Sequence, residues 1–466
     1  MPQSSGARSA RHRLGAPAAA TAALAVMAAT ATAALAVMAA TATAALAVVA
    51  ALGAVPGTAI ASGGGGSGGA GFGSPSGGAG HSGPGSGAAH HGHRPPAGPS
   101  RAANPLSGRA MWIWELPYVE QGNVAQIVSV AHRYGVGTLL VKSSDGTTGW
   151  PQQFNRQFVA ELHAGGLHVC AWQYVYGTHP VTEAYLGAGA IHDGADCLVI
   201  DAESEYEGRY IQAQTYIDRL RKLIGPRFPV ALAGFPFVDF HPAFPYSVFL
   251  GPGGAQLDVP QMYWHAIGVS TDAVFAHTYS DNLVYGRPIV PLGQVYGTPP
   301  IHQIVRFRQL SRAYGAPGVS WWDWQEARAS DWSALSRPAG PLRGYVPYTT
   351  MAPLSQGAQG DMVVWAQEHL VSAREPVAIS GQFGYHTLLA VQAFQAAHGL
   401  AVDGTIGEQT WTALLRYRPV TVRWLLPHHG HGLAVATARR AVTAPVPASA
   451  SLAARHEIGS VGRGGR

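Results

Sequence analysis

Short apolar runs alternate with segments of helical character through the middle of the chain, between Gly108 and Tyr345. Runs of this length that are bounded by glycine, proline or polar turn residues predict β-strands. Eight runs are found: Ala110 to Glu115, Gly137 to Lys142, His168 to Tyr174, Cys197 to Glu203, Pro229 to Phe235, Leu257 to Trp264, Pro288 to Val295 and Val319 to Trp324. Eight successive strand–helix units predict an α/β fold, a (β/α)8 TIM barrel over residues 105–345.

A second pattern lies between Leu354 and Leu415. Apolar residues recur there at helical spacing, around Val363 and Leu370 and again between Leu388 and Phe394, and glycines separate the two groups. This pattern predicts a small all-α domain of about three short helices over residues 350–418.

The two ends of the chain lack such patterns. Residues 1–61 combine Arg8, Arg11 and Arg13 with a long run of alanine, valine and leucine, then Ala59-Ile60-Ala61, which predicts an export signal. If it stays uncleaved, this apolar run is long enough to hold the protein at a membrane. Residues 62–104 are rich in glycine, serine, proline and histidine and predict a flexible linker, and residues 419–466 predict a disordered basic tail.

Charge and cysteine content narrow the function. The net charge of +5 and the pI of about 9.2 suit an anionic cell wall. Lysines and arginines are not concentrated with aromatic residues on one element, so we expect no nucleic-acid binding. The two cysteines, Cys170 and Cys197, lie in predicted strands, where either one disulfide or two buried thiols is consistent with the sequence.

The active site of a (β/α)8 barrel lies at the carboxyl ends of its strands. Polar and aromatic residues gather at these ends in the sequence. The strand ends supply the carboxylates Glu115, Asp201, Glu203 and Asp323, and we expect substrate contacts from Trp112, Asp145, Trp172, Tyr174, Gln261, Tyr263, Trp264 and Trp322. Carboxylates and amides among aromatic rings suit a sugar, whose apolar ring faces stack on aromatics while its hydroxyls bind polar groups.

The fourth run ends in Asp201-Ala202-Glu203. Alternate side chains of a strand share a face, so Asp201 and Glu203 are expected to project together into the barrel mouth. Two such carboxylates repel each other, and the pKa of one should rise, which makes a general acid available near neutral pH. We assign Glu203, nearer the rim, as this acid and Asp201 as the supporting carboxylate. Glu205 and Glu207 are expected to face solvent.

Five motifs in the all-α segment resemble the peptidoglycan-binding domain type 1 family. They are Gly357 to Asp361, Phe383 to Thr387, Ala390 to Gln395, Gly399 to Gly404 and Gly407 to Trp411. The segment departs from the family at Ile379-Ser380-Gly381, where an aspartate usually precedes the glycine. This resemblance implies attachment to the cell wall, with peptidoglycan or a related glycan as the partner.

The barrel resembles glycosidases that act on peptidoglycan and chitin. Asp201-Ala202-Glu203 at the fourth strand and the tryptophan-rich eighth strand are closest to the family 25 lysozymes. That resemblance places further acids at Glu115 and Asp323, although the family has aspartate where Glu115 stands. The sequence Gln261 to Trp264 is similar instead to the sixth strand of family 18 chitinases, in which the tyrosine contacts an N-acetyl group.

These observations predict an exported, monomeric wall protein that hydrolyses a β-linked amino-sugar glycan, in the manner of a muramidase. No closely spaced His-x-x-x-His ligands occur in the barrel, and its cysteines lie in apolar strands, so we expect no metal, no cofactor and no thiol chemistry. The alternative is a glycan-binding wall protein whose barrel has lost activity. The glutamate at position 115 favours that alternative.

Overall fold

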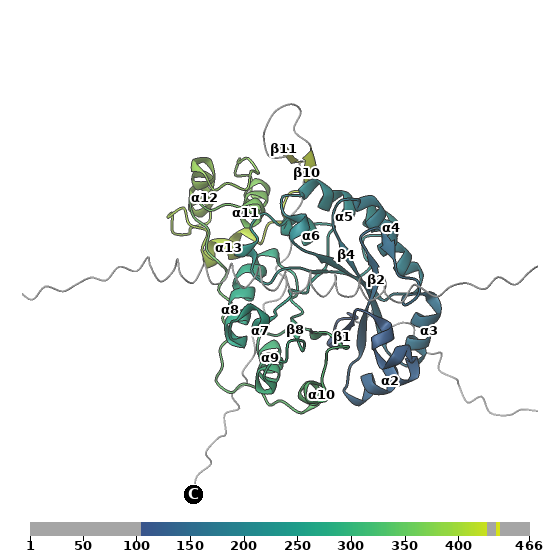
Figure 1. Ribbon diagram of the computed structural model, residues 1–466. Helices are drawn as coiled ribbons and strands as arrows, with labels where there is room; N and C mark the ends of the chain where they lie inside the picture. Colours follow the sequence, from purple (N-terminus) through teal and green to yellow (C-terminus); the bar gives the residue numbers. More distant parts are fainter. Residues whose placement is uncertain (1–103, 426–434, 439–466) are drawn as a thin grey trace, which may run out of the picture. The chain divides into compact units, whose positions relative to one another are not determined.

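The computed structural model describes residues 104–425 and 435–438, so the predicted export segment, nearly all of the linker and most of the tail lie outside the described residues. Eight parallel strands are present, in the spatial order β7-β6-β5-β4-β2-β1-β9-β8. Isolated bridges from Asp258 to Ile289 and from Gln261 to Leu292 join the two ends of this order. The predicted (β/α)8 barrel is therefore confirmed (Figure 1).

The strands of the barrel are β1 (Gly108–Ile113), β2 (Thr138–Asp145), β4 (His168–Val175), β5 (Cys197–Ala202), β6 (Val230–Ala233), β7 (Leu257–Asp258), β8 (Leu292–Gln294) and β9 (Gly318–Trp322), and β3 (Thr148–Gly149) pairs antiparallel with β2. The helices are α2 (Val124–Arg133), α3 (Arg156–Ala164), α4 (Pro180–His192), α5 (Tyr210–Ile224), α6 (Tyr246–Phe249), α7 (Trp264–Ile267), α8 (Thr271–Asn282), α9 (Ile301–Ala313) and α10 (Ala329–Ser336). Among the described residues, no helix is both long and apolar enough to cross a membrane.

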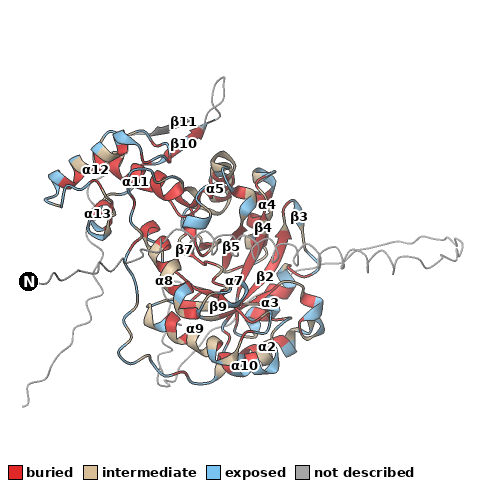
Figure 2. Cartoon of the chain, turned by 60° about the vertical axis from the view of Figure 1, so that its left-hand side comes forward, coloured by how far each residue is buried: buried red, intermediate tan, exposed pale blue. Residues whose placement is uncertain are grey.

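Side-chain alternation along the strands creates two separate apolar layers. One fills the barrel and includes Trp112, Leu140, Trp172 and Val199, while the other lies between the strands and the surrounding helices. Figure 2 shows that most residues of the barrel strands are buried. Cys170 and Cys197 occupy paired positions of β4 and β5 inside the barrel, with Cα atoms 4.6 Å apart, and form a disulfide. Of the two states that the sequence allows, the structure has the disulfide.

The sixth predicted strand is much shorter than expected. The run from Leu257 to Trp264 was expected to be one strand, but β7 ends at Asp258 and α7 begins at Trp264. Pro260 has no N–H to donate to a neighbouring strand. Gln294 on β8 then accepts hydrogen bonds from the backbone N–H groups of His265 and Ala266, at 2.8 and 3.0 Å, which fixes the first turn of α7.

The predicted all-α domain is also confirmed. It consists of α11 (Asp361–Ser372), α12 (Tyr385–Ala397) and α13 (Glu408–Leu414). Every residue of α11 from Asp361 to Leu370 is buried, so this helix has no exposed face along that length. Most of its apolar residues, Trp365 and Leu370 among them, belong to the same core cluster as the outer layer of the barrel, whereas Val364 packs with Val422 and Trp424.

A buried carboxylate at the start of α11 joins the helical domain to the barrel. Asp361 accepts hydrogen bonds from the backbone N–H and hydroxyl of Ser247, both at 2.7 Å, and from the Tyr285 hydroxyl at 2.9 Å. The indole of Trp365 donates to the carbonyl of Val284 at 2.7 Å. Gly360 permits this approach, because a Cβ there would lie 2.6 Å from Pro242. The helical domain is thus packed on the barrel and not only tethered to it.

The chain beyond α13 also packs on the barrel. We expected no regular structure from residue 419 onward, but β10 (Val422–Leu425) pairs antiparallel with β11 (Val435–Ala438). The Gln214 side chain on α5 bonds the carbonyl of Val422 and the N–H of Trp424, and Trp424 packs on Tyr210 with ring centroids 4.3 Å apart. Two backbone groups of this short strand are therefore bonded by a helix of the barrel.

Replacing Asp361 should destabilise the whole protein. In Asp361→Ala, the donors of Ser247 and Tyr285 are left buried without an acceptor, and we expect a loss of about 3 kcal/mol in the free energy of unfolding. Asp361→Asn keeps one acceptor oxygen and should lose about half as much. Chemical denaturation measures both, with the exposed Gln409→Ala as control. A loss under about 1 kcal/mol in Asp361→Ala would contradict this role.

Candidate functional site

Two acidic side chains meet one amide at the barrel mouth. Asp201 is the last inward-facing residue of β5, Glu203 follows the strand by one residue, and Gln261 follows β7. The Gln261 side-chain nitrogen donates to Asp201 Oδ1 at 3.0 Å and to Glu203 Oε1 at 2.9 Å. An amide NH2 group has two hydrogens, so it can donate one hydrogen bond to each carboxylate. The structure therefore brings together three of the residues predicted for the site.

Burial raises the pKa of both carboxyl groups, since the charged form is poorly solvated there. At Asp201 the charge of Glu203 raises the pKa further, whereas the ammonium of Lys142 opposes the rise. At Glu203 the hydrogen bond from Gln261 opposes the rise in pKa, and the charge of Glu205 adds to it. The acidic pair, Asp201 and Glu203, therefore keeps a proton to a higher pH than an isolated carboxyl group would.

A buried lysine at the site was not predicted from the sequence. Lys142 faces inward from β2, is 5% exposed, and forms an ion pair with Asp145 at 2.6 Å. Its ammonium lies 4.7 Å from the ring centre of Trp150 and 4.8 Å from that of Trp172. Asp145, which we expected to bind substrate, also accepts a hydrogen bond from the Tyr176 hydroxyl at 2.9 Å. The sequence places Lys142 at the end of a predicted strand, and this position could have indicated that it belongs to the site.

Glu205 belongs to the site, contrary to the expectation that it faces solvent. It is half-buried, and its carboxylate accepts a hydrogen bond of 2.9 Å from the hydroxyl of Tyr174 on β4. Burial and the charges of Glu203 and Glu205 raise the pKa of Tyr174. Glu207, by contrast, is exposed, as expected, and pairs with His241 at 2.7 Å.

Tryptophans form the floor of the mouth. Trp112 and Trp172 are almost fully buried, with ring centres 5.4 Å apart. Trp322 packs on both, at 5.6 and 5.3 Å, but remains half-buried, as does Trp114 beside it. Trp322 and Trp114 are therefore the indoles that a sugar could reach, while Trp112 and Trp172 support them.

The residues after β7 divide between the mouth and the core. Tyr263 lies near the acidic pair, whose charges, together with burial, raise its pKa, and its ring meets that of Tyr296 at 5.4 Å. Trp264, which we expected to contact substrate, is fully buried in the helix layer. Its indole donates to Gln303 at 2.9 Å and packs on Phe307. The structure thus places Tyr263 at the mouth and Trp264 away from it, because α7 begins between them.

The other two predicted acids have different surroundings. Asp323 is 1% exposed and has one oxygen without a hydrogen-bond partner, and burial together with the charge of Glu326 raises its pKa to about 7. Glu115 follows β1, is half-buried, and has no hydrogen bond to the acidic pair. Its backbone N–H donates to the side chain of Gln325 at 3.4 Å.

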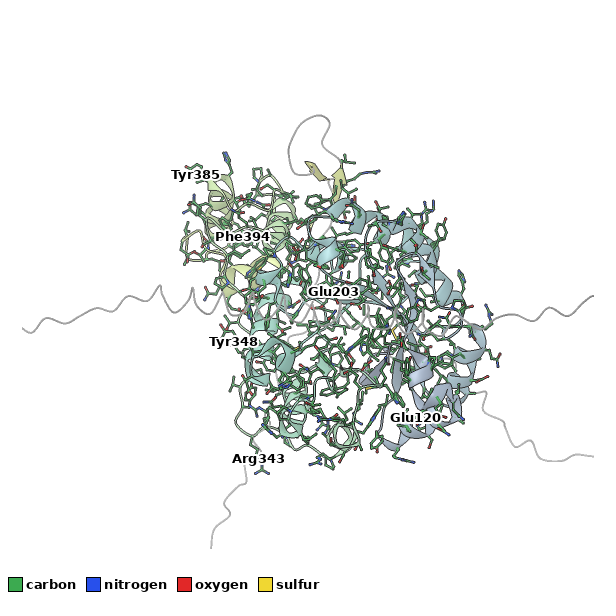
Figure 3. All side chains as sticks on the ribbon, in the orientation of Figure 1. Glu120, Glu203, Arg343, Tyr348, Tyr385 and Phe394 are labelled. Carbon is green, nitrogen blue, oxygen red and sulfur yellow. A yellow bond between two sulfur atoms is a disulfide. The ribbon has the colours of Figure 1, made fainter. Side chains whose placement is uncertain are left out.

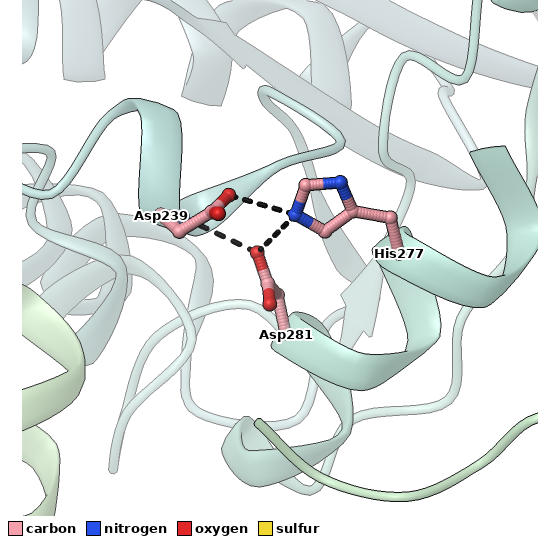
Figure 4. A group of neighbouring side chains, drawn as sticks. All are labelled: Asp239, His277 and Asp281. Carbon is pink, nitrogen blue, oxygen red and sulfur yellow. Dashed lines mark hydrogen bonds and ion pairs between the residues drawn. The ribbon is translucent and has the colours of Figure 1, made fainter. Parts of the chain in front are cut away.

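One group of side chains has the composition of a metal site. Asp239, His277 and Asp281 bring their ligand atoms within 4.8 Å of one another (Figure 4). Burial lowers the pKa of His277, but its bonds to Asp239 at 2.9 Å and Asp281 at 3.5 Å outweigh this and raise the pKa to about 9. The imidazole is therefore protonated at neutral pH, and a metal would have to displace that proton. The geometry fits an ion pair better than an open ligand set.

The comparisons with known proteins match either a short segment of this chain or about half of it. Residues 359–414 match the family described as "Putative peptidoglycan binding domain", which confirms the predicted domain. The zinc D-Ala-D-Ala carboxypeptidase of Streptomyces albus G is 38% identical over 85 residues, or 18% of this chain and 32% of that protein. The chain therefore spans about a third of the length of the carboxypeptidase. An uncharacterized protein in the bpoA1 3' region of Kitasatospora aureofaciens is 38% identical over 84 residues, or 18% of this chain and 70% of that protein.

Solved structures also resemble the barrel at a distance. A chitinase from Chromobacterium violaceum is 11% identical, with a TM-score of 0.35, and the match covers 49% of this chain and 98% of that one. A likeness at this level carries no argument about function. Through residues 359–414, this chain belongs to the family of peptidoglycan-binding domains.

Proposed function

We propose that this protein hydrolyses a β-linked amino-sugar glycan of the bacterial cell wall, with a muramidase-like specificity. The observation that carries the proposal is the pair of Asp201 and Glu203, held by one amide at the mouth of a barrel on the same chain as a peptidoglycan-binding domain. Glu203 is labelled in Figure 3. The protein is exported, acts at the wall as a monomer, and needs no cofactor.

Glu203 is the general acid in this mechanism. It lies nearer the rim than Asp201 and donates its proton to the glycosidic oxygen as the bond from that oxygen to the sugar C1 breaks. Asp201 stabilises the positive charge that develops on the sugar, directly or through a substrate N-acetyl group near Tyr263. Water then supplies the hydroxyl at C1, and its other proton passes to the Glu203 carboxylate, which restores the acid. Trp322 and Trp114 stack on sugar rings at the floor of the mouth.

The alternative function is glycan binding without hydrolysis. It is favoured by one observation: Glu115 stands where family 25 lysozymes have aspartate, and it has no bond to the acidic pair. In that case the helical domain would still hold the protein on peptidoglycan. Activity of the parent protein on purified wall therefore separates the two functions.

Removal of the acid should abolish hydrolysis and leave wall binding intact. We expect Glu203→Gln to release reducing sugar ends from purified peptidoglycan about 10²–10⁴ times more slowly than the parent, because the amide cannot donate the required proton. Glu207→Gln, which changes an exposed acid nearby, should match the parent. Retained release in Glu203→Gln would overturn the assignment. Intact sedimentation with the wall, but no release from either protein, would support the binding function.

The pH profile should respond to Glu205. Its negative charge raises the pKa of Glu203, so Glu205→Gln should lower that pKa. The acid then loses its proton at lower pH, and the alkaline limb of kcat/KM should move down by about one pH unit. The same profile measured for Glu207→Gln is the control. An unmoved limb, or one that moves to higher pH, would contradict the coupling.

A further inference from the structure

We propose that Lys142 is a positioning residue whose buried ammonium favours the ionised form of Asp201, so that the proton shared by the acidic pair is drawn toward Glu203. Its catalytic importance rests on the proposed function. The distribution of charge is a property of the folded protein and is measurable without any substrate.

Lys142 is enclosed on the inner face of the barrel. It is 5% exposed, with its ammonium among the rings of Trp114, Trp150 and Trp172 at 4.7 to 5.8 Å and Asp145 at 2.6 Å. Burying an ammonium is costly unless charges or ring faces compensate for the lost water. A cation held in this way has little freedom to turn toward solvent, so its charge acts on its neighbours inside the barrel.

The strand register places this charge beside the deeper member of the acidic pair. Asp145 on β2 pairs with Tyr174 on β4, and Tyr174 pairs with Asp201 on β5, so these residues occupy one level of the barrel. Lys142 lies just below that level on β2, opposite Trp172, whereas Glu203 lies beyond the end of β5 at the rim. The ammonium is therefore on the Asp201 side of the pair.

Burial alone would place the shared proton on the wrong carboxyl group. Asp201 is 6% exposed and Glu203 is half-buried, so loss of solvation favours the neutral form of Asp201 more than that of Glu203. A general acid needs the opposite arrangement, with the proton at the rim. The Lys142 ammonium lowers the pKa of Asp201 and thereby opposes the effect of burial.

The other ionisable groups around the pair are acidic. Asp145 and Glu205 carry negative charge when ionised, and the phenols that face the pair are those of Tyr174, Tyr263 and Tyr296. Asp323 lies behind Tyr263, and Glu326 lies beside Asp323 and Tyr296. Asp145 partly offsets Lys142, but the effect of Lys142 on Asp201 is the larger of the two. Lys142 is thus the basic residue that favours ionisation of Asp201.

The test is a carboxyl 13C NMR titration of the full chain, in the parent and in Lys142→Met. Methionine keeps the length of the side chain and its packing on the tryptophans but removes the charge. We expect the Asp201 carboxyl to titrate at least about one pH unit higher in the variant, with Glu203 titrating lower as the proton moves inward. Lys142→Arg keeps the charge and should stay near the parent.

A shift of the Asp201 titration below about half a unit in folded Lys142→Met would overturn the proposal. If that variant does not fold, Lys142→Gln retains a donor for Asp145 without the charge, and the same criterion applies. Tyr176→Phe removes the other partner of Asp145 and should leave the Asp201 titration within that half unit. A larger shift in Tyr176→Phe than in the Lys142 variants would assign the effect to Asp145 and also overturn the proposal.

Activity on purified wall then separates this inference from the proposed function. If the parent hydrolyses glycan, Lys142→Met should lower kcat at every pH by about tenfold or more with little change in KM, since the acid loses its proton to Asp201. If the parent does not hydrolyse glycan, the proposed function fails, and the titration alone still decides where the proton resides.

Discussion

The alternation of side chains along eight parallel strands is the constraint on which the site depends. Inward positions must fill the barrel, and outward positions must pack on helices, so a regular strand contributes every second residue to the mouth. In β2 the register shifts between Lys142 and Ser144, and both Lys142 and Asp145 reach the site. Trp112 and Trp172 occupy inward positions and support the half-buried Trp322 above them. Asp201 lies above the same floor, so the packing that stabilises the barrel also removes water from its carboxylate.

A single amide then holds two groups that repel each other. Without Gln261, the carboxylates of Asp201 and Glu203 would have to separate or bind a second proton. The amide donates to both at once, and its own position follows from the bridge between Gln261 and Leu292 that joins the ends of the sheet. The bridge between Gln261 and Leu292 therefore both closes the barrel and positions the amide that holds the acidic pair.

The sequence was sufficient for features that depend on local alternation and insufficient for those that depend on distant contacts. Eight strands, the all-α domain and the pairing of Asp201 with Glu203 follow from periodicity. The removal of Trp264 from the mouth does not, because α7 begins where Gln294, on another strand, accepts its N–H groups. The environment of Lys142 likewise needs three tryptophans from separate segments, which no local pattern indicates.

The burial of α11 changes how wall attachment should be understood. A flexible tether would raise the concentration of glycan near the barrel without fixing its direction. Here Asp361 and Trp365 bond barrel residues, so the helical domain is packed against the barrel. Under the proposed function, the surface left for glycan on this domain lies away from α11 and includes α12, where Tyr385 and Leu389 are exposed. Tyr385, labelled in Figure 3, points away from the rest of the domain. If the proposed hydrolysis takes place, a wall strand bound there would have a fixed direction relative to the barrel, so attachment would orient the glycan as well as concentrate it.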